Sequence, residues 1–298
     1  MQCYKPLIAY RTRDGGITFN PKKGFVDLQV NLRCGQCIGC RLHKSKEWAI
    51  RCVEEMREHE DNCFITLTFD DEKLQDPLQN YTLIKKDFQK FMKRLRKNTG
   101  KKIRYFHCGE YGEKFSRPHH HAILFGYDFP DKKETRRSKL GHPQFSSEIL
   151  SKAWQDQGDA MVSEANFDTA AYVARYCTKL YNKSKGSPED YPTQDEFYQG
   201  RVPEYTTMSR RPGIGHTYFE KYKDEIYRDD YIIINNKKMK PPTYYDNLMK
   251  VVNESQLERV KANRVKRAKD DPDYEDLNRL YAKELCRELQ LKQWNRNL

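Results

Sequence analysis

This chain of 298 residues carries 55 Lys and Arg against 43 Asp and Glu, a formal net charge of +12. It shows neither an apolar run of membrane-spanning length nor a secretion signal, so we expect a soluble protein that stays in the compartment where it is made, with no membrane partner. Because neutralising phosphates releases counterions, the excess cations favour a nucleic-acid partner over a role in solubility alone, and 12% aromatic residues suit single strands.

The N-terminal segment holds four of the nine cysteines and little periodic pattern. An odd number of cysteines in a chain without a secretion signal argues against a disulfide framework. Cys34, Cys37 and Cys40 follow a C-x-x-C-x-x-C pattern, whose turns let thiolates converge on one ion. Cys3 or His43 would complete a tetrahedral site. We favour structural Zn²⁺ with Cys3 as the fourth ligand, over an iron–sulfur cluster or free thiols.

After Ser45, which is placed to cap a helix, apolar residues recur at helical spacing. Residues 63–69 are rich in aromatic and β-branched types and predict a strand. A second amphipathic helix follows, with its apolar stripe over residues 83–95 and lysines around it. Two more strands, 103–110 and 119–126, are joined by a glycine-containing connection that suits a hairpin.

A helix near residues 149–154 then precedes a strand at 160–166. Asp168 is placed to cap the next helix, which runs from Thr169 to about Tyr181. The order strand, helix, strand, strand, helix, strand is the split βαβ arrangement of ferredoxin-like α+β domains. We therefore expect an α+β fold built on an antiparallel sheet.

Composition divides the chain into three expected parts. Residues 1–44 form a cysteine-rich, metal-binding extension, and residues 45–245 form the main domain. Within that domain, residues near 182–207 are rich in Gly, Ser, Pro and acidic types and predict a long insertion. Residues 246–298 are predicted to be helical and strongly charged, with a thin apolar stripe typical of a packing or oligomer contact.

Three consecutive histidines lie on the strand at 119–126. Alternate side chains of a strand share a face, so His119 and His121 project together and can bind one cation, while His120 points the other way. Glu110, which ends the preceding strand, is the expected third ligand, with Glu113 as the fallback. Two histidines and a carboxylate leave positions open for a substrate phosphate and suit Mg²⁺ or Mn²⁺. A histidine cluster without metal is the plainer alternative.

Tyr172 and Tyr176 are four residues apart and share one face of their predicted helix. With 20 tyrosines in the chain, such pairs arise by coincidence and usually belong to the core. Lys179 falls near the same face, one turn further on. A phenol with a pKa near 10 needs a cation, a base or a polarised phosphate nearby to attack well, and the expected metal would supply the polarisation.

Arg210 and Arg211 precede the glycine-containing stretch Pro212-Gly213-Ile214-Gly215. Two forked cations beside glycines that permit close backbone approach suit a phosphate backbone. We predict DNA contacts there and at Arg175 on the tyrosine helix, with an ordinary basic turn as the alternative.

Several of these segments resemble motifs of known proteins. Residues 64–69, 118–121 and 172–179 resemble, in this order, the three motifs of HUH replication initiators. Residues 34–40 and 208–215 more narrowly resemble the initiators of gokushovirus-type Microviridae, which are small single-stranded DNA phages. The middle residue of the histidine motif is usually bulky and apolar, and its replacement here by a histidine leaves open a ligand pair that includes that residue.

The resemblance touches most of residues 3–245 and implies a ferredoxin-like or RRM-like sheet that carries the histidines. In that family a tyrosine attacks single-stranded DNA at a replication origin, leaving a 5′-phosphotyrosine and a 3′-hydroxyl that primes rolling-circle replication. A second tyrosine lets the enzyme cut again and rejoin the strand, so Tyr172 and Tyr176 are expected to alternate. The resemblance also implies the host replication helicase and polymerase as partners, and the host bacterial cytoplasm as location.

Two other classes of function remain open. Two histidines and a carboxylate also form the facial triad of non-haem iron oxygenases, which would need neither paired tyrosines nor so basic a chain. A non-catalytic, zinc-binding nucleic-acid-binding protein would bury Tyr172 and Tyr176 far from the histidines. A tyrosine hydroxyl that can approach His119 and His121 favours the nicking enzyme over both.

Overall fold

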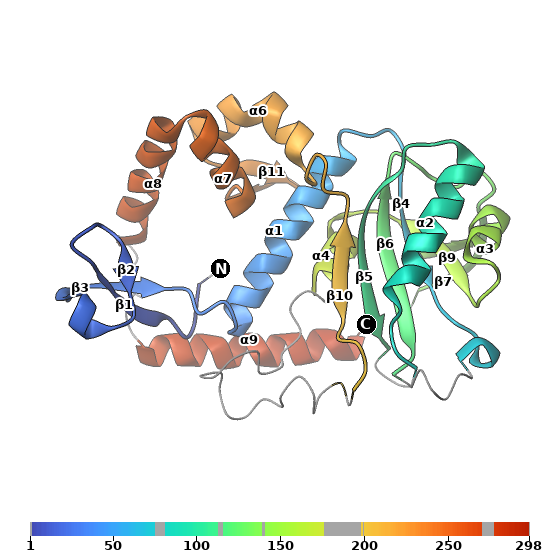
Figure 1. Ribbon diagram of the computed structural model, residues 1–298, viewed down its shortest axis with the longest axis horizontal. Helices are drawn as coiled ribbons and strands as arrows, with labels where there is room; N and C mark the ends of the chain where they lie inside the picture. The colour runs from blue at the N-terminus through green and yellow to red at the C-terminus, as the bar shows by residue number, and fades with distance from the viewer. Residues whose placement is uncertain are drawn as a thin grey trace. The chain divides into compact units, whose positions relative to one another are not determined.

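The computed structural model describes residues 2–74, 81–112, 116–138, 141–175, 198, 200–269 and 277–297. The chain splits into two compact units (Figure 1). One combines Met1–Lys44 with Lys261–Leu298, and the other is Ser45–Val260. Each unit is described by itself below.

The first unit contains a three-stranded antiparallel sheet in the order β2-β1-β3, where the sequence pattern indicated loops. Its strands are β1 (Leu7–Arg11), β2 (Ile17–Thr18) and β3 (Phe25–Leu32), with a 3₁₀ turn at Pro21–Lys23. The helix α9 (Leu277–Asn297) and most of α8 (Glu254–Lys269) belong to the same unit.

The second unit is built on a seven-stranded sheet in the order β10-β5-β6-β4-β9-β8-β7, in which every neighbouring pair is antiparallel. The strands are β4 (Asn62–Leu67), β5 (Arg104–Tyr111), β6 (Pro118–Phe125), β7 (Lys133–Arg137), β8 (Pro143–Ser146), β9 (Ala160–Glu164) and β10 (Tyr205–Met208). The expected α+β class with an antiparallel sheet is confirmed, and the four predicted strands are the central β5, β6, β4 and β9.

Helices and one hairpin complete the second unit. The helices are α1 (Ile38–Met56), which continues from the first unit, α2 (Lys85–Thr99), α3 (Glu148–Trp154), α4 (Phe167–Arg175), α6 (His216–Asp229) and α7 (Thr243–Val252), with a 3₁₀ turn at Asp71–Leu74. The hairpin pairs β11 (Ile232–Ile234) with β12 (Lys237–Met239). In the described part of the chain, no helix has the length and apolar character needed to cross a membrane.

Two expected helix caps are wrong, each for a physical reason. Ser45 lies inside α1 rather than before it, and its buried hydroxyl donates to the Ala171 carbonyl at 3.0 Å, which ties α1 to α4. At the start of α4, the Asn166 side chain accepts from the N–H groups of Asp168 and Thr169, both at 3.0 Å. Asn166, not Asp168, is therefore the residue that satisfies the free N–H groups of the first turn.

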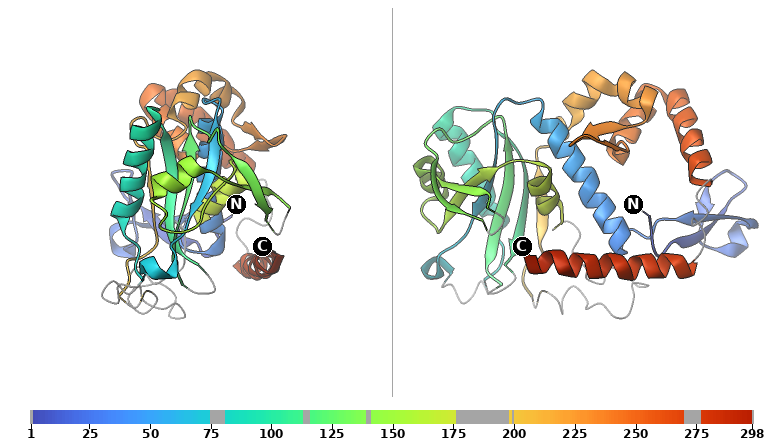
Figure 2. Two further views of the ribbon diagram at one scale, coloured as in Figure 1. Left: turned by 90° about the vertical axis from the view of Figure 1, so that its right-hand side faces the viewer. Right: turned by 180° about the vertical axis from the view of Figure 1, so that it is seen from behind.

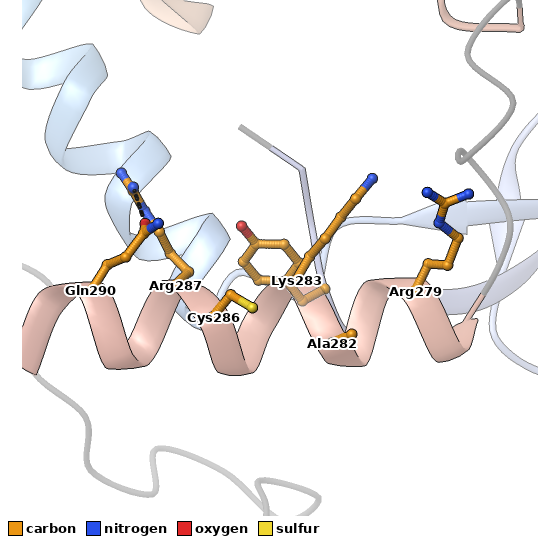
Figure 3. Close-up of a pocket in the computed structure, with 7 residues that line it drawn as sticks. Arg279, Ala282, Lys283, Cys286, Arg287 and Gln290 are labelled. Carbon is orange, nitrogen blue, oxygen red and sulfur yellow. Dashed lines mark hydrogen bonds between the residues drawn. The ribbon is translucent and has the colours of Figure 1, made fainter.

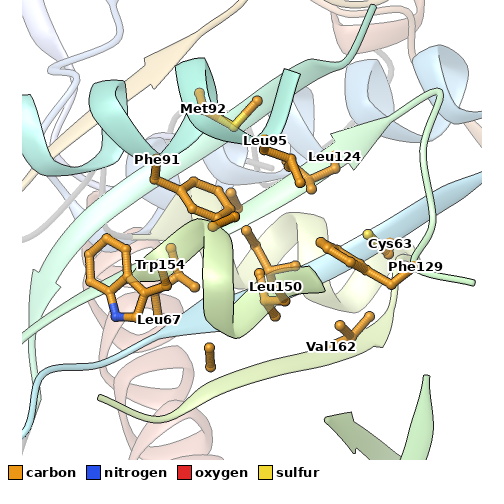
Figure 4. Close-up of a cluster of buried hydrophobic side chains, with 14 of the residues drawn as sticks. Cys63, Leu67, Phe91, Met92, Leu95, Leu124, Phe129, Leu150, Trp154 and Val162 are labelled. Atoms are coloured by element: carbon orange, nitrogen blue, oxygen red, sulfur yellow. The ribbon is translucent and has the colours of Figure 1, made fainter. Parts of the chain in front are cut away.

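Helices cover both faces of the main sheet (Figure 2). On one face, α2 and α3 pack on a core that includes Ala122 and Leu124 of β6 (Figure 4). On the other, α1 and α4 pack on a core that includes Ile123 and Phe125 of the same strand. Since side chains alternate along a strand, the odd-numbered residues of β6 face α1 and α4.

The fully buried Leu124, 0% exposed, tests the α2 and α3 core. We expect Leu124→Ala to lower the free energy of unfolding by about 2–5 kcal/mol, because truncation leaves a cavity that the packed neighbours do not fill. Urea denaturation measures the change, and Lys97→Ala on the exposed side of α2 is the control, with an expected change within about 0.5 kcal/mol. A loss below about 1 kcal/mol for Leu124→Ala would contradict this packing.

Candidate active site

The hairpin of β5 and β6 carries the predicted carboxylate and histidines. Its register places Glu110 directly opposite His119, and Cys108 opposite His121. Residues opposite each other in an antiparallel pair share a face, so Glu110, His119 and His121 all lie on the face covered by α1 and α4. The Gly112 N–H donates to the Arg117 carbonyl at 2.9 Å and closes the described end of this hairpin.

A buried chain of hydrogen bonds runs through His121. Its Nε2 lies 2.8 Å from Oε1 of Glu110, and its Nδ1 lies 3.1 Å from the hydroxyl oxygen of Thr66 on β4. Glu110 is 4% exposed and His121 7%. With Nε2–H donating to the carboxylate, Nδ1 accepts from the Thr66 hydroxyl, so both ends of the imidazole are oriented.

His119 stacks parallel to His121, with ring centroids 6.3 Å apart and an angle of 9° between the planes. Its Nδ1 lies 2.8 Å from the Arg117 carbonyl oxygen, which accepts the Nδ1–H. This hydrogen bond selects the tautomer that leaves Nε2 with its lone pair, as metal-binding histidines require. Burial, opposed in part by that hydrogen bond, lowers the pKa of His119 and keeps the imidazole neutral.

The three residues have the chemistry of a cation site, but they do not form a closed set of ligands. Oxygen and nitrogen ligands that each lie about 2.1 Å from one ion are at most about 4 Å apart. Across the described ranges, only a group of four cysteines brings three or more potential ligand atoms within 4.8 Å of one another. Glu110 and His121 are in direct contact, so binding one cation would require their mutual hydrogen bond to open and His119 to turn toward them.

Tyr172 of α4 lies at this site. Its hydroxyl donates to Oε1 of Glu110 at 3.3 Å, and its ring meets His121 edge-on, with centroids 5.1 Å apart. Phe64 of β4 packs against both rings. The structure therefore brings together four predicted residues from two strands and one helix: Glu110, His119, His121 and Tyr172. The other predicted residues Tyr176 and Lys179, and the fallback ligand Glu113, lie outside the described residues.

His120 points to the opposite face of the sheet. Its Nδ1 lies 3.1 Å from Nε2 of His107 on β5, whose Nδ1 lies 2.9 Å from the hydroxyl of Thr207 on β10. Phe88 stacks on His107 with centroids 3.6 Å apart. Burial lowers the pKa of His120 to about 3, so this imidazole stays neutral. Sequence reasoning missed His107 and Thr207, because their pairing joins residues 100 positions apart.

Comparisons with known proteins bear directly on this site. The sequence profile of a family described as replication-associated protein, of the ORF2 type, matches residues 62–181. Replication-associated protein ORF2 of Spiroplasma virus 4 is 31% identical over 293 residues, which cover 90% of this chain and 87% of that protein. The chain belongs to the phage replication-associated protein family.

Two further phage proteins are similar to this replication-associated protein. Replication-associated protein VP4 of Bdellovibrio phage phiMH2K is 32% identical over 260 residues, covering 84% of this chain and 78% of its own length. Replication-associated protein ORF4 of Chlamydia phage 1 is 30% identical over 234 residues, with 74% and 53% covered. No solved structure matches. The profile match runs from β4 through α4 and so contains the whole cluster around Glu110.

The arginine loop of the replication-associated protein, residues 210–215, is held in place by its backbone. Arg104, at the start of β5, donates to the Pro212 carbonyl at 2.9 Å, and the Gly215 N–H donates to Glu55 of α1 at 2.7 Å. The two arginines of the loop are exposed. Arg104 and Glu110 are six residues apart on β5, about 20 Å along the strand. The loop therefore lies at the far end of β5 from the histidines.

Glu55 also binds the start of β5, since Arg104 Nε donates to its carboxylate. Burial alone would raise the pKa of Glu55, but hydrogen bonds from His59, the Gly215 N–H and Arg104 hold it below its ordinary value. A charged Glu55 thus joins α1, β5 and the arginine loop. Arg175, predicted with the loop to contact DNA, is exposed at the end of α4, one turn from Tyr172.

The four cysteines near the N-terminus form the group that has the geometry of a metal site. The Sγ atoms of Cys3 and Cys34 are 3.6 Å apart, those of Cys3 and Cys37 3.9 Å, and those of Cys34 and Cys40 4.0 Å. Four thiolates around one zinc-sized ion at about 2.3 Å would lie about 3.8 Å apart. These separations exclude a disulfide, whose sulfurs are about 2.0 Å apart. The cluster could therefore hold a metal, and Cys3 is its fourth member.

Backbone N–H groups point at these sulfurs. The Tyr4 N–H lies 3.3 Å from Sγ of Cys37, and the N–H of Cys37 lies 3.2 Å from Sγ of Cys34. A hydrogen bond from the Cys40 thiol, together with that of Tyr4, lowers the pKa of Cys37 and favours its thiolate. Gly39 makes the close packing possible, because a Cβ there would lie 2.2 Å from the carbonyl oxygen of Gln2.

We expect the purified protein to carry one tightly bound ion per chain at this cluster, measured by inductively coupled plasma mass spectrometry. Cys37→Ser should reduce the metal content by roughly tenfold, because a closed tetrahedral site loses one of its four thiolates. Cys286→Ser, which changes an exposed cysteine outside the cluster, is the matched control and should leave the content unchanged. Equal metal content in both variants would contradict the assignment.

Proposed function

We propose that this chain is a metal-dependent single-strand DNA endonuclease and strand transferase of the HUH type, which initiates rolling-circle replication. One observation carries the proposal: the Tyr172 hydroxyl lies 3.3 Å from Oε1 of Glu110, the carboxylate that also contacts His121. A nucleophile, a carboxylate and two imidazoles thus meet on one face of the sheet. Membership of the replication-associated family supports the biological role.

The topology supports the same proposal. The four central strands lie in the order β9-β4-β6-β5, with α2 between β4 and β5 in sequence and α3 between β6 and β9. This is the strand and helix order of a split βαβ, ferredoxin-like domain. In such a domain the middle strands carry the site, and here β6 carries the histidines.

The proposed cofactor is Mg²⁺ or Mn²⁺, held by Glu110, His119 and His121, and when bound it would polarise the scissile phosphate. Tyr172 is held within reach by α4. Its phenolic oxygen would form a bond to phosphorus while the bond from phosphorus to the 3′ oxygen breaks. The phenol loses its proton and the 3′ oxygen gains one, giving a 5′-phosphotyrosine and a 3′-hydroxyl.

The remaining assignments complete the proposal. Tyr176 would make the second cut and rejoin the strand, and Lys179 would orient the phosphate. Arg175, Arg210 and Arg211 would contact the DNA backbone. Since the arginine loop lies about 20 Å from Glu110 along β5, a strand touching both would span several nucleotides.

Zn²⁺ is the metal we propose for the cysteine cluster, as four thiolates favour it. Single-stranded DNA at the replication origin is the proposed partner of the active site. The host helicase and polymerase would unwind the template and extend the freed 3′-hydroxyl. We place this activity in the host bacterial cytoplasm, where the phage DNA would be copied.

Both competing functions fit the site less well. A non-catalytic binding protein has no use for a tyrosine hydroxyl in contact with the Glu110 carboxylate. A facial-triad oxygenase could use Glu110, His119 and His121, but it does not account for Tyr172 or for a charge of +12. The tyrosine contact therefore favours strand cleavage.

Covalent attachment to DNA tests the proposed chemistry. Incubation with a panel of single-stranded oligonucleotides and Mn²⁺ should give an adduct that resists denaturation in SDS. Tyr172→Phe combined with Tyr176→Phe removes both proposed nucleophiles and should reduce the adduct by at least about 100-fold, and His119→Ala should do likewise. A tyrosine pair of the same spacing on α6 provides the control: Tyr218→Phe with Tyr222→Phe should keep the adduct. An adduct that survives the Tyr172 and Tyr176 double change refutes the nucleophile.

Gly112 tests the position of His119. A Cβ at residue 112 would lie 2.8 Å from Cε1 and 3.2 Å from Nδ1 of the His119 ring. We expect Gly112→Ala to displace this imidazole and to weaken Mn²⁺ binding at the active site by about tenfold, measured by isothermal titration calorimetry. Gly100→Asn, at a left-handed helix end with no side chain nearby, should bind Mn²⁺ normally. Equal affinity in the two variants would argue against His119 as a ligand.

A further inference from the structure

A second surface with the chemistry of nucleic-acid binding lies in the first unit, outside the residues that the family profile matches. There the N-terminal segment and α9 enclose an open cavity of about 410 Å³ (Figure 3). Its lining includes three cations, one aromatic ring and small side chains, but no Asp or Glu: Tyr4, Arg279, Ala282, Lys283, Cys286 and Arg287.

The cations are arranged as a row by the way α9 is anchored. Leu280 and Glu284 are 2% and 6% exposed and lie four residues apart, so they mark the side of the helix that packs. Oε2 of Glu284 lies 3.5 Å from Nζ of Lys5, which binds α9 to the N-terminal segment and pairs the buried carboxylate.

Arg279, Lys283 and Arg287 are spaced at i, i+4 and i+8 on the cavity side of α9. Each step rises about 6 Å along the helix, on the order of the distance between successive phosphates of one nucleic-acid strand. Figure 3 shows Arg279 and Lys283 extending to the same side of the helix, with Arg287 hydrogen-bonded to Gln290 at 3.0 Å. Such a row can follow a phosphate backbone rather than a single anion.

Tyr4 gives the cavity an aromatic surface, and its position is coupled to the cysteine cluster. It follows Cys3 directly, and its own N–H points at Sγ of Cys37, 3.3 Å away. A cation-lined groove with an aromatic ring is the combination that binds single strands, because each base can stack on a ring while the phosphates meet the cations.

We infer that this cavity is a second DNA-binding site, which takes the phosphates of single-stranded DNA along Arg279, Lys283 and Arg287 with a base on Tyr4. It is separate from the nicking residues and does not depend on their chemistry. The metal cluster fixes the backbone that presents the aromatic ring, so this site needs both ends of the chain.

The experiment is fluorescence anisotropy with labelled dT20 and the full-length protein, without added Mn²⁺, over a range of salt concentrations. The variant Arg279→Ala/Lys283→Ala/Arg287→Ala should bind about 10- to 100-fold more weakly at about 0.1 M salt. The slope of log affinity against log salt should fall by about 2, because three phosphate contacts are lost. The matched control, Lys86→Ala/Lys90→Ala/Lys97→Ala, removes the same charge from exposed positions of α2 and should keep both values close to wild type.

A second pair of variants isolates the ring. Tyr4→Ala should weaken dT20 binding roughly tenfold, whereas Tyr4→Phe, which keeps the stacking surface, should bind like wild type. Metal content, measured on each variant, shows whether the cysteine cluster is intact. If Tyr4→Phe loses as much affinity as Tyr4→Ala, base stacking is refuted.

Other results overturn the site as a whole. Unchanged affinity and salt slope in the α9 variant would do so, as would an equal loss in the α2 control, which would indicate a general effect of net charge. Competition by poly-glutamate as effective as that by unlabelled dT20 would show an unspecific anion surface. Failure of the nicking proposal is distinguished separately: Tyr172→Phe abolishes no binding in this assay, whatever it does to the adduct.

Discussion

The alternation of side chains along β6 is the constraint on which the rest of the site depends. It sends His119 and His121 to the face covered by α1 and α4, and His120 to the face covered by α2. Because neighbours in a strand cannot share a face, three consecutive histidines are divided between two environments. One environment offers Glu110 and Tyr172 to the imidazoles, and the other offers only His107 and a packed aromatic core.

Burial makes these hydrogen bonds consequential. Glu110 and His121 are nearly inaccessible to solvent, so a carboxylate there depends on the imidazole and the phenol for its polar contacts. In a dry pocket a hydrogen bond or a bound cation acts with little screening by water. The helix that carries Tyr172 is held by the Ser45 hydroxyl, so the phenol is positioned by α1 as well as by the sheet.

The part of this architecture that can be predicted from sequence is the part written in local periodicity. The strands β4, β5, β6 and β9 have apolar runs, and the residue spacing within the β5 and β6 hairpin was enough to place Glu110 with the histidines. β7 reads Lys-Glu-Thr-Arg-Arg and is exposed throughout, so no pattern marks it as a strand. β10 pairs with β5 across about a hundred residues, which no local signal encodes.

That long-range pairing explains what the sequence could not show about the arginines. Composition alone grouped Arg210 and Arg211 with the nicking residues, but the register of β10 carries them toward Arg104. The helix cap at Ser45 was misplaced for a related reason, since the cysteine turn before it already starts α1. Contacts made by partners distant in sequence decided both cases.

The β5 strand also sets a fixed length scale on the protein. Arg104 and Glu110 lie an even number of positions apart, so both point to one side, and an extended strand can neither shorten nor stretch. Removing one residue between them would turn one end over to the opposite side, whereas removing two would bring the ends closer with their orientation kept. β5 therefore works as a ruler, and a nucleic-acid chain laid along it would be measured in whole nucleotides.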